Sequence, residues 1–248
     1  MATKVLCIGA HNDEIMADMG GTVHELHKSG CEILILNLAC KYLDINNTLS
    51  EEDKQRYQKE EISAARILGA DLKSENDRES LLFLESAKAI EYTARVIMDF
   101  APDLVFIHLP RDNHFEHREV AKTSYKALCV AASCGTNFSE VYAFQTGIRQ
   151  SAQYCRPDFF VDVTDDLDTV KESLLQFKQK YAPGEALAKT YELQRQYEGL
   201  IAKVPYAEEF KIVKFPNGSD DILLKKLLGK KFIWYGHGSY PAFGENYF

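Results

Sequence analysis

Two short runs of the sequence gather acid and histidine side chains that bind metals or move protons. The first run holds His11, Asp13 and Glu14 and closely follows the apolar residues 5–8. The second run follows another apolar stretch and again mixes acids with histidines, namely Asp112, His114, Glu116 and His117. Acid–histidine clusters behind two predicted strands indicate one metal site assembled from both, with hydrolytic chemistry at that site.

Three of these side chains suit a catalytic zinc site. Zinc in such sites commonly takes three protein ligands from histidine and carboxylate groups and keeps one position for water. His11 and Glu14 are three residues apart, so a tight turn can direct both to one ion, and His117 can supply the third ligand. Two imidazoles and a carboxylate favour zinc, with iron, cobalt or nickel as alternatives. Zinc lowers the pKa of its bound water to about 7, which makes a hydroxide-like nucleophile.

The other side chains of the two runs suit proton transfer and orientation. Asp13 lies beside the predicted ligand Glu14, and we predict that Asp13 acts as the general base. His114 is predicted to stabilise the oxyanion of a tetrahedral intermediate. Glu116 and Asp112 are candidates to orient the imidazoles through hydrogen bonds, as carboxylates around metal sites commonly do. Together these parts predict hydrolysis of an amide.

Other histidines compete with this interpretation. His24 and His27 are three residues apart in a predicted helix, so they can face the same side. However, the segment offers no third ligand, and helical zinc motifs use a spacing of four residues. We therefore interpret this pair as part of a helix surface. His108 ends an apolar run and can contact either the site or the core.

The elements that position the two clusters alternate between strand and helix. The expected strands are residues 4–9, 32–37, 104–108, 142–145, 159–163, 209–214 and 232–235, and the expected helices are 22–29, 51–68, 86–100, 119–132, about 166–181 and 185–202. Near-continuous apolar strands in this order predict a Rossmann-like α/β fold, with a mostly parallel sheet covered by helices on both faces. Ligands of such sheets bind beyond the carboxyl ends of the strands, where both clusters fall. The first strand lacks a Gly-x-Gly-x-x-Gly turn, so no nucleotide cofactor is indicated.

Length and composition limit the class of protein. The 248 residues suit a single domain over 1–248, with residues from about 215 as a C-terminal extension. A net charge of −8 argues against a nucleic-acid partner. No apolar run approaches the ~18 residues of a membrane span, and the N-terminus has no signal-peptide core. The six cysteines form no Cys-x-x-Cys pair and are expected to be reduced thiols. We therefore expect a cytoplasmic protein.

The motifs resemble those of the LmbE-like (PIG-L) family of zinc-dependent N-deacetylases. That family opens with a strand, Ala-His-Pro-Asp-Asp, a spacer and Gly-Gly, and this chain has Ala-His-Asn-Asp-Glu at residues 10–14 and Gly-Gly at 20–21. The second family motif resembles Pro-x-Asp-x-His-Pro-Asp-His-Arg, which reads Pro-Arg-Asp-Asn-His-Phe-Glu-His-Arg at residues 110–118. Weaker similarities extend to about residue 214 and lie at residues 60–69, 161–164 and 206–210.

The resemblance implies a zinc site with the ligands His11, Glu14 and His117. It also implies that Asp13 is the general base, that His114 stabilises the transition state, and that Glu116 stands where the family has an aspartate. Glutamate also replaces a family aspartate at position 14, so the turn must shift to keep coordination. The implied reaction removes an N-acetyl or other N-acyl group from an amino sugar or glycoconjugate. Hydrolysis of another small amide conjugate and a non-catalytic metal- or sugar-binding relative are the alternatives.

Overall fold

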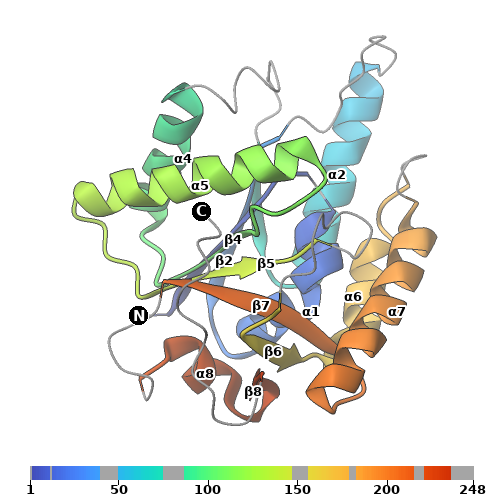
Figure 1. Ribbon diagram of the computed structural model, residues 1–248. Coiled ribbons are helices and arrows are strands. Elements are labelled where there is room, and N and C mark those ends of the chain that lie inside the picture. Colours follow the sequence, from blue (N-terminus) through green and yellow to red (C-terminus); the bar gives the residue numbers. More distant parts are fainter. Residues whose placement is uncertain are drawn as a thin grey trace.

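The computed structural model describes residues 2–11, 13–39, 50–74, 87–146, 156–178, 183–214 and 221–235. The strands within these ranges are β1 (Lys4–Gly9), β2 (Glu32–Asn37), β3 (Asp71–Ser74), β4 (Leu104–His108), β5 (Glu140–Phe144), β6 (Phe159–Asp162), β7 (Ala207–Lys214) and β8 (Phe232–Trp234). The helices are α1 (Glu14–Lys28), α2 (Glu51–Ile67), α4 (Ala87–Phe100), α5 (Phe115–Ser133), α6 (Leu167–Leu174), α7 (Gly184–Ala202) and α8 (Leu223–Leu228), with the short 3₁₀ turns η1 (Thr164–Asp166) and η2 (Gly229–Lys231). Figure 1 shows their arrangement.

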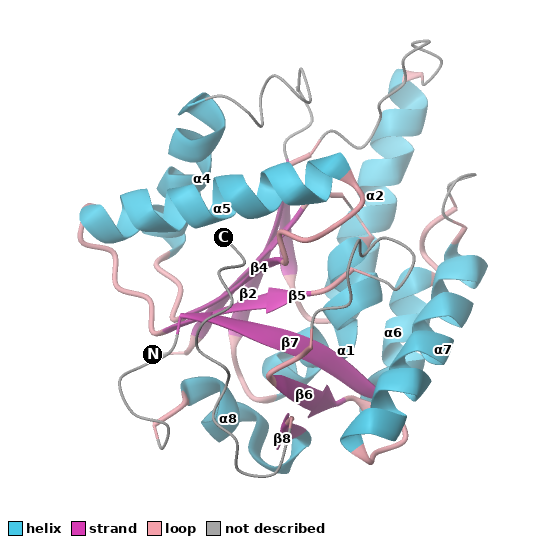
Figure 2. Cartoon of the chain, viewed as in Figure 1, coloured by secondary structure: helices cyan, strands magenta, loops and turns pink. Residues whose placement is uncertain are grey.

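The described strands form one sheet in the order β3-β2-β1-β4-β5-β7-β6-β8. The first five strands of this order are parallel, whereas β7, β6 and β8 pair antiparallel with their neighbours. Helices α4 and α5 lie on one side of the sheet, and α1, α6 and α7 lie on the other (Figure 2). The predicted α/β fold with a mostly parallel, two-sided sheet is therefore confirmed.

Alternate residues of each central strand enter the two cores. In β1, Val5 and Cys7 face the core formed with α1 and α6, while Leu6 and Ile8 face the core formed with α4 and α5. All four side chains are buried. Because successive side chains of a strand point to opposite faces, a strand buried on both faces must be apolar throughout. This requirement explains why β1 appears in the sequence as an unbroken apolar run.

The topology brings the two acid–histidine runs to one place. β1 pairs with β2 on one side and with β4 on the other. The chain thus moves outward from β1 to β2 and β3 and then returns to continue from β4 in the opposite direction. Ligands of open parallel sheets bind at the carboxyl ends of the strands where this reversal occurs. The two runs follow β1 and β4, so both lie at that crevice.

Two helices begin earlier than the sequence predicts. α1 begins at Glu14 rather than at residue 22, and it is broken at Met19, which has φ −145° and ψ 22°. The predicted helix began after the pair Gly20 and Gly21, but both glycines lie inside α1. α5 begins at Phe115, so the second run of acids and histidines enters the first turn of a helix.

The described part of the C-terminal segment belongs to the sheet and its core. β8 pairs antiparallel with β6, and Leu224 and Leu228 of α8 are buried against the core on the α1 side. The single domain with an extension from about residue 215 stays a prediction, and residues 215–220 and 236–248 lie outside the described residues. None of the helices in the described ranges combines the length and apolar character needed to cross a membrane.

Candidate metal centre

The fold places the two acid–histidine runs in direct contact. His11 lies two residues after β1, and Glu116 lies in the first turn of α5. Nε2 of His11 is 2.6 Å from Oε2 of Glu116, although the residues are 105 positions apart in the sequence. The expectation that both runs meet at one edge of the sheet therefore agrees with the geometry.

The three side chains predicted as ligands direct one atom each to a common point. Oε1 of Glu14 is 2.5 Å from Nδ1 of His11 and 2.9 Å from Nε2 of His117. The two nitrogen atoms are 3.3 Å apart. Ligand atoms that surround a tetrahedral zinc ion at about 2.1 Å lie roughly 3.4 Å from one another. The three atoms thus need to separate by less than about 1 Å to hold such an ion.

The side chain of Glu14 is long enough for its carboxylate to contact the backbone of His11 and the two imidazoles. Glu14 is the first residue of α1, and its side chain reaches back over the turn. Its Oε2 accepts a hydrogen bond of 2.5 Å from the backbone N–H of His11, while Oε1 faces both imidazoles. The backbone contact fixes the carboxylate in the turn, so the additional methylene relative to aspartate is accommodated without removing the carboxylate from the imidazoles.

Carboxylates also occupy the outer nitrogen of each imidazole. Glu116 contacts Nε2 of His11, and Oδ2 of Asp112 is 2.8 Å from Nδ1 of His117. An ionised carboxylate can only accept hydrogen bonds, so each outer nitrogen carries the proton. Imidazoles that bind metals commonly have this carboxylate contact, which orients the ring and raises its basicity. The arrangement therefore presents Nδ1 of His11 and Nε2 of His117 to a ligand.

The charges of the cluster favour a cation. Burial opposes protonation of His11 and His117, but the charge of Glu14 and the carboxylate hydrogen bonds outweigh it, so the pKa of His11 is well above its ordinary value and that of His117 is about 9. Burial opposes ionisation of Glu14, but the charges of His11 and His117 hold its pKa well below the ordinary range. Oε1 of Glu116 is buried without a hydrogen-bond partner among the described residues. A divalent cation would replace the inner protons and compensate this excess of carboxylates, so the residues fit a metal.

Asp13 is available for proton transfer. It occupies the N-cap position of α1, where an aspartate usually accepts a backbone hydrogen bond, but its side chain makes no such bond. Burial, followed by the charge of Glu14, raises the pKa of Asp13 to about 6. A cation nearby would lower that pKa, because it favours the charged carboxylate.

His114 lies beside the proposed ligands as a neutral imidazole. Its ring centroid is 4.9 Å from that of His11 and 4.5 Å from that of His117. Burial, followed by the charges of His117 and His11, lowers its pKa. Nitrogen atoms of these three imidazoles all lie within 4.8 Å of one another, so His114 is an alternative third ligand. The oxygen of Glu14 lies closer to the other two ligand atoms and is the better candidate.

Two further residues support the cluster. His108 is fully buried, its Nε2 accepts a hydrogen bond of 2.9 Å from the backbone N–H of Ala10, and its ring stacks on His117 at 4.7 Å. Burial lowers the pKa of His108 to about 4, so it is neutral. The hydroxyl of Thr146 donates to Oδ2 of Asp112. Sequence reasoning missed Thr146, and its only signal was its position two residues after a strand that neighbours β4.

Among the described residues, the group that could hold a metal ion is His11, His114 and His117, and the competing histidine pair is not part of it. Nδ1 of His24 is 2.6 Å from Oδ1 of Asp166, which also pairs with Lys28. His27 is exposed and packs against Gly69, where an added Cβ would lie 2.1 Å from the imidazole. The ring centroids of His24 and His27 are 6.5 Å apart. Both histidines therefore have structural contacts on the helix surface.

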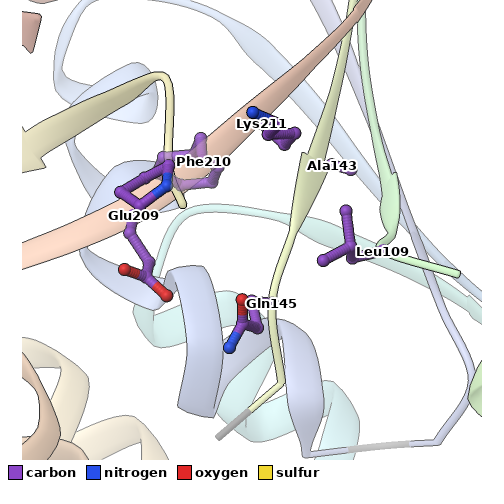
Figure 3. Close-up of a pocket in the computed structure, with 7 residues that line it drawn as sticks. Leu109, Ala143, Gln145, Glu209, Phe210 and Lys211 are labelled. Carbon is purple, nitrogen blue, oxygen red and sulfur yellow. The ribbon is translucent and has the colours of Figure 1, made fainter. Parts of the chain in front are cut away.

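Two cavities are lined by residues outside the acid–histidine cluster. A cavity of about 10 Å³, with room for about one water molecule, lies between β5 and β7 (Figure 3). Its lining residues are Leu109, Ala143, Gln145, Pro157, Glu209, Phe210 and Lys211. A hollow of about 510 Å³ runs along α2 between Lys59 and Ile67. None of the acid and histidine residues of the cluster is among those that line either cavity.

Solved structures with the same fold carry out more than one reaction. The 4-carboxy-2-hydroxymuconate hydratase GalB of Pseudomonas putida KT2440 is 20% identical, with a TM-score of 0.74 over 89% of this chain and 99% of that chain. A conserved protein of Thermus thermophilus is also 20% identical, with a TM-score of 0.70 over 86% and 96%. The N,N'-diacetylchitobiose deacetylase of Pyrococcus horikoshii is 23% identical, with a TM-score of 0.68 over 89% of both chains. At these identities the likeness establishes the fold and leaves the reaction open.

The sequence profile of one family spans both halves of the cluster. Residues 6–128 match PIG-L, described as GlcNAc-PI de-N-acetylase. This range contains both acid–histidine runs, together with β4 and most of β1, the strands that position them. The match agrees with the resemblance found from the motifs, and the chain carries a PIG-L family domain over residues 6–128.

Proposed function

We propose that this protein is a metal-dependent hydrolase that removes an N-acetyl or other N-acyl group from an amino sugar or glycoconjugate. The observation that carries this proposal is the convergence of three ligand atoms, from His11, Glu14 and His117. Beside them in the chain is Asp13, whose carboxylate makes no capping hydrogen bond to α1. The description of the family as a de-N-acetylase supports the amide bond as the target.

The chain's own residues have separate tasks in this reaction. A divalent cation held by His11, Glu14 and His117, which we propose to be zinc, would supply a nucleophile from water at neutral pH and would polarise the amide carbonyl. Asp13 accepts the proton of the attacking water. His114 donates a hydrogen bond to the oxyanion that forms from the carbonyl oxygen. The amine leaves after Asp13 or His114 returns a proton to it, so that one amide and one water give a protonated amine and a carboxylate.

Glu116 and Asp112 act through the two imidazoles. Each carboxylate keeps a proton on the outer nitrogen and thereby leaves the inner nitrogen free to bind the cation. Asp112 also accepts a hydrogen bond of 2.7 Å from the backbone N–H of His114. A single carboxylate thus connects a proposed ligand with the residue proposed to stabilise the oxyanion, which favours a cluster with fixed geometry.

Among the described residues, a candidate surface for the sugar part of the proposed substrate lies beside His114. Phe115 is 39% exposed and stacks on His114, with ring centroids 5.3 Å apart. An aromatic ring beside the reacting groups offers an apolar face to a sugar ring. The family description and the chitobiose deacetylase of the same fold support a sugar substrate. A cytoplasmic location stays a prediction.

A substrate panel tests the proposal. Protein loaded with zinc is incubated with N-acetylated amino sugars, nucleotide sugars and glycolipids, and acetate and free amine are measured together. We expect equal amounts of both products from at least one sugar, and no product with a His117→Ala variant. Release from non-sugar amides alone would favour the hydrolase of another small conjugate. Bound zinc without release from any amide would favour a non-catalytic binding protein and overturn the proposal.

A further inference from the structure

The helix that carries the proposed ligand Glu14 is interrupted. α1 is broken at Met19, five residues after Glu14, and continues to Lys28. A break in a helix leaves carbonyl groups before it and N–H groups after it without partners inside the helix. This break is buried, so the freed groups need partners from elsewhere in the protein.

A buried arginine binds a carbonyl group on the first side of the break. Nη1 of Arg195, from α7, donates a hydrogen bond of 2.6 Å to the backbone oxygen of Asp18. Nη2 of the same side chain donates to Oε1 of Glu198 at 2.9 Å. Arg195 is only 1% exposed, and the carboxylate of Glu198 compensates its charge. Arg195 therefore holds the end of the helix segment that begins with Glu14.

A buried carboxylate binds the N–H groups on the second side of the break. Glu208, from β7, accepts hydrogen bonds from the backbone N–H groups of Gly21 at 2.8 Å and Thr22 at 2.7 Å. The hydroxyls of Thr22 and Tyr191 donate to the same carboxylate at 2.6 Å and 2.8 Å. This arrangement is an N-cap supplied by a distant strand, and a carboxylate there is also favoured by the helix dipole.

A close contact fixes the position of the second segment. A Cβ atom at Gly21 would lie only 2.5 Å from the Cβ of Val163, so only glycine permits this approach. Val163, Arg195 and Glu208 all lie outside residues 6–128, the range of the family match. Val163 and Glu208 come from segments 161–164 and 206–210, whose similarity to the family motifs is weak, and Arg195 comes from α7. The proposed reaction assigns no task to these three parts of the chain.

We propose that Arg195 and Glu208 are positioning residues for Glu14, because together they maintain the break in α1. If Glu208 could not accept the N–H groups of Gly21 and Thr22, these groups would recover partners by closing the break into regular helix. Closing it would change the direction of the first segment and move the Glu14 carboxylate relative to His11 and His117. The inference rests on the proposed metal site, and it makes the second half of the chain necessary for metal affinity.

A matched pair of variants tests the inference. Glu208→Gln replaces one of the two carboxylate oxygens that accept the backbone N–H groups of Gly21 and Thr22. The control is Glu140→Gln, because Glu140 is also buried and accepts hydrogen bonds from two backbone N–H groups, Leu223 at 2.5 Å and Leu224 at 2.9 Å, and from a tyrosine hydroxyl. Glu140 caps α8, which carries no proposed site residue. Zinc affinity is measured by competition with a chromophoric chelator, and stability by urea unfolding.

We expect both variants to lose stability, and Glu208→Gln alone to bind zinc about tenfold more weakly. A zinc affinity within twofold of the wild type for Glu208→Gln, or an equal loss for Glu140→Gln, would overturn the inference. If Glu208→Gln does not fold, Thr22→Val removes only one of the four hydrogen bonds, and an unchanged zinc affinity in that variant would also overturn it. Wild-type protein that binds no zinc would overturn the proposed function. Zinc binding that His117→Ala abolishes and Glu208→Gln leaves intact would refute the positioning role alone.

Discussion

Replacing Glu116 by glutamine isolates the contribution of its charge to metal binding. Oε2 of Glu116 is 2.6 Å from Nε2 of His11, and the glutamate side chain is 2% exposed. Glutamine has nearly the same shape and can still accept this hydrogen bond. However, its amide can also donate, which would move the imidazole proton to Nδ1, the nitrogen that faces the proposed metal.

The expected loss follows from the strength of the contact. Hydrogen bonds to charged groups contribute about 1.5–3 kcal/mol, and neutral ones about 0.5–1.5 kcal/mol. The substitution therefore removes about 1–2 kcal/mol from metal binding, which corresponds to roughly 5- to 30-fold weaker affinity. This range overlaps the 10- to 100-fold loss that is common when a carboxylate behind a metal-binding histidine is changed.

The assay compares zinc dissociation constants of the wild type, Glu116→Gln and a control. The control is Asp166→Asn, because Asp166 pairs with His24 at the same 2.6 Å but lies outside the proposed centre. We expect weaker zinc binding in Glu116→Gln and wild-type binding in Asp166→Asn. An affinity within twofold of the wild type for Glu116→Gln would refute the role of Glu116, and an equal loss in both variants would refute its specificity.

Three further outcomes follow from the site and the fold. Asp13→Asn should retain zinc but lower kcat by about 10²- to 10⁴-fold, the range of general-base catalysis, and loss of zinc would instead make Asp13 a ligand. His114→Ala should retain zinc and lower kcat by about 10²- to 10³-fold, whereas zinc loss would place His114 among the ligands. Burial raises the pKa of Asp166, but hydrogen bonds, including those of Lys28 and His24, outweigh it and hold the pKa below the ordinary value. Because folding lowers the pKa of Asp166, the ionised carboxylate stabilises the folded protein fully above about pH 4. This stabilisation is lost as the pH falls through the pKa that Asp166 has in the folded protein. Asp166→Asn should therefore lower the free energy of unfolding by about 1.5–3 kcal/mol at neutral pH, and this difference should shrink below pH 4 in urea titrations. A difference that persists unchanged at pH 3 would contradict the assignment.

The sheet could be predicted because its central strands must be apolar on both faces. β2 and β4 have the bounds that the sequence predicts, residues 32–37 and 104–108. β3 was missed because Asp-Leu-Lys-Ser at the sheet edge alternates exposed and half-buried residues and lacks an apolar run. α8 was missed because its six residues are too few to show a helical period. The predicted helix was shorter than α1 because it began only after Gly20 and Gly21. The contacts of these glycines with distant segments, which hold them inside the helix, cannot be read from the sequence.

The sequence suggests the residues of the proposed site, but most of their hydrogen-bond partners could not be predicted. Spacing alone placed His11 near Glu14, because a turn connects residues three apart. The sequence raised Glu116 and Asp112 as orienting carboxylates but left their partners open. The pairing depends on the start of α5 at Phe115, which determines the direction of each side chain. The contacts of Arg195 and Glu208 with α1 join segments more than 170 residues apart, and no local pattern records them.

Anomalous diffraction across the zinc edge tests the central claim most directly, in crystals grown with zinc. We expect a single strong peak about 2.0–2.3 Å from Nδ1 of His11, Nε2 of His117 and a carboxylate oxygen of Glu14. A zinc ion bound by His114 in place of Glu14, or no peak between His11 and His117, would contradict the proposed metal centre.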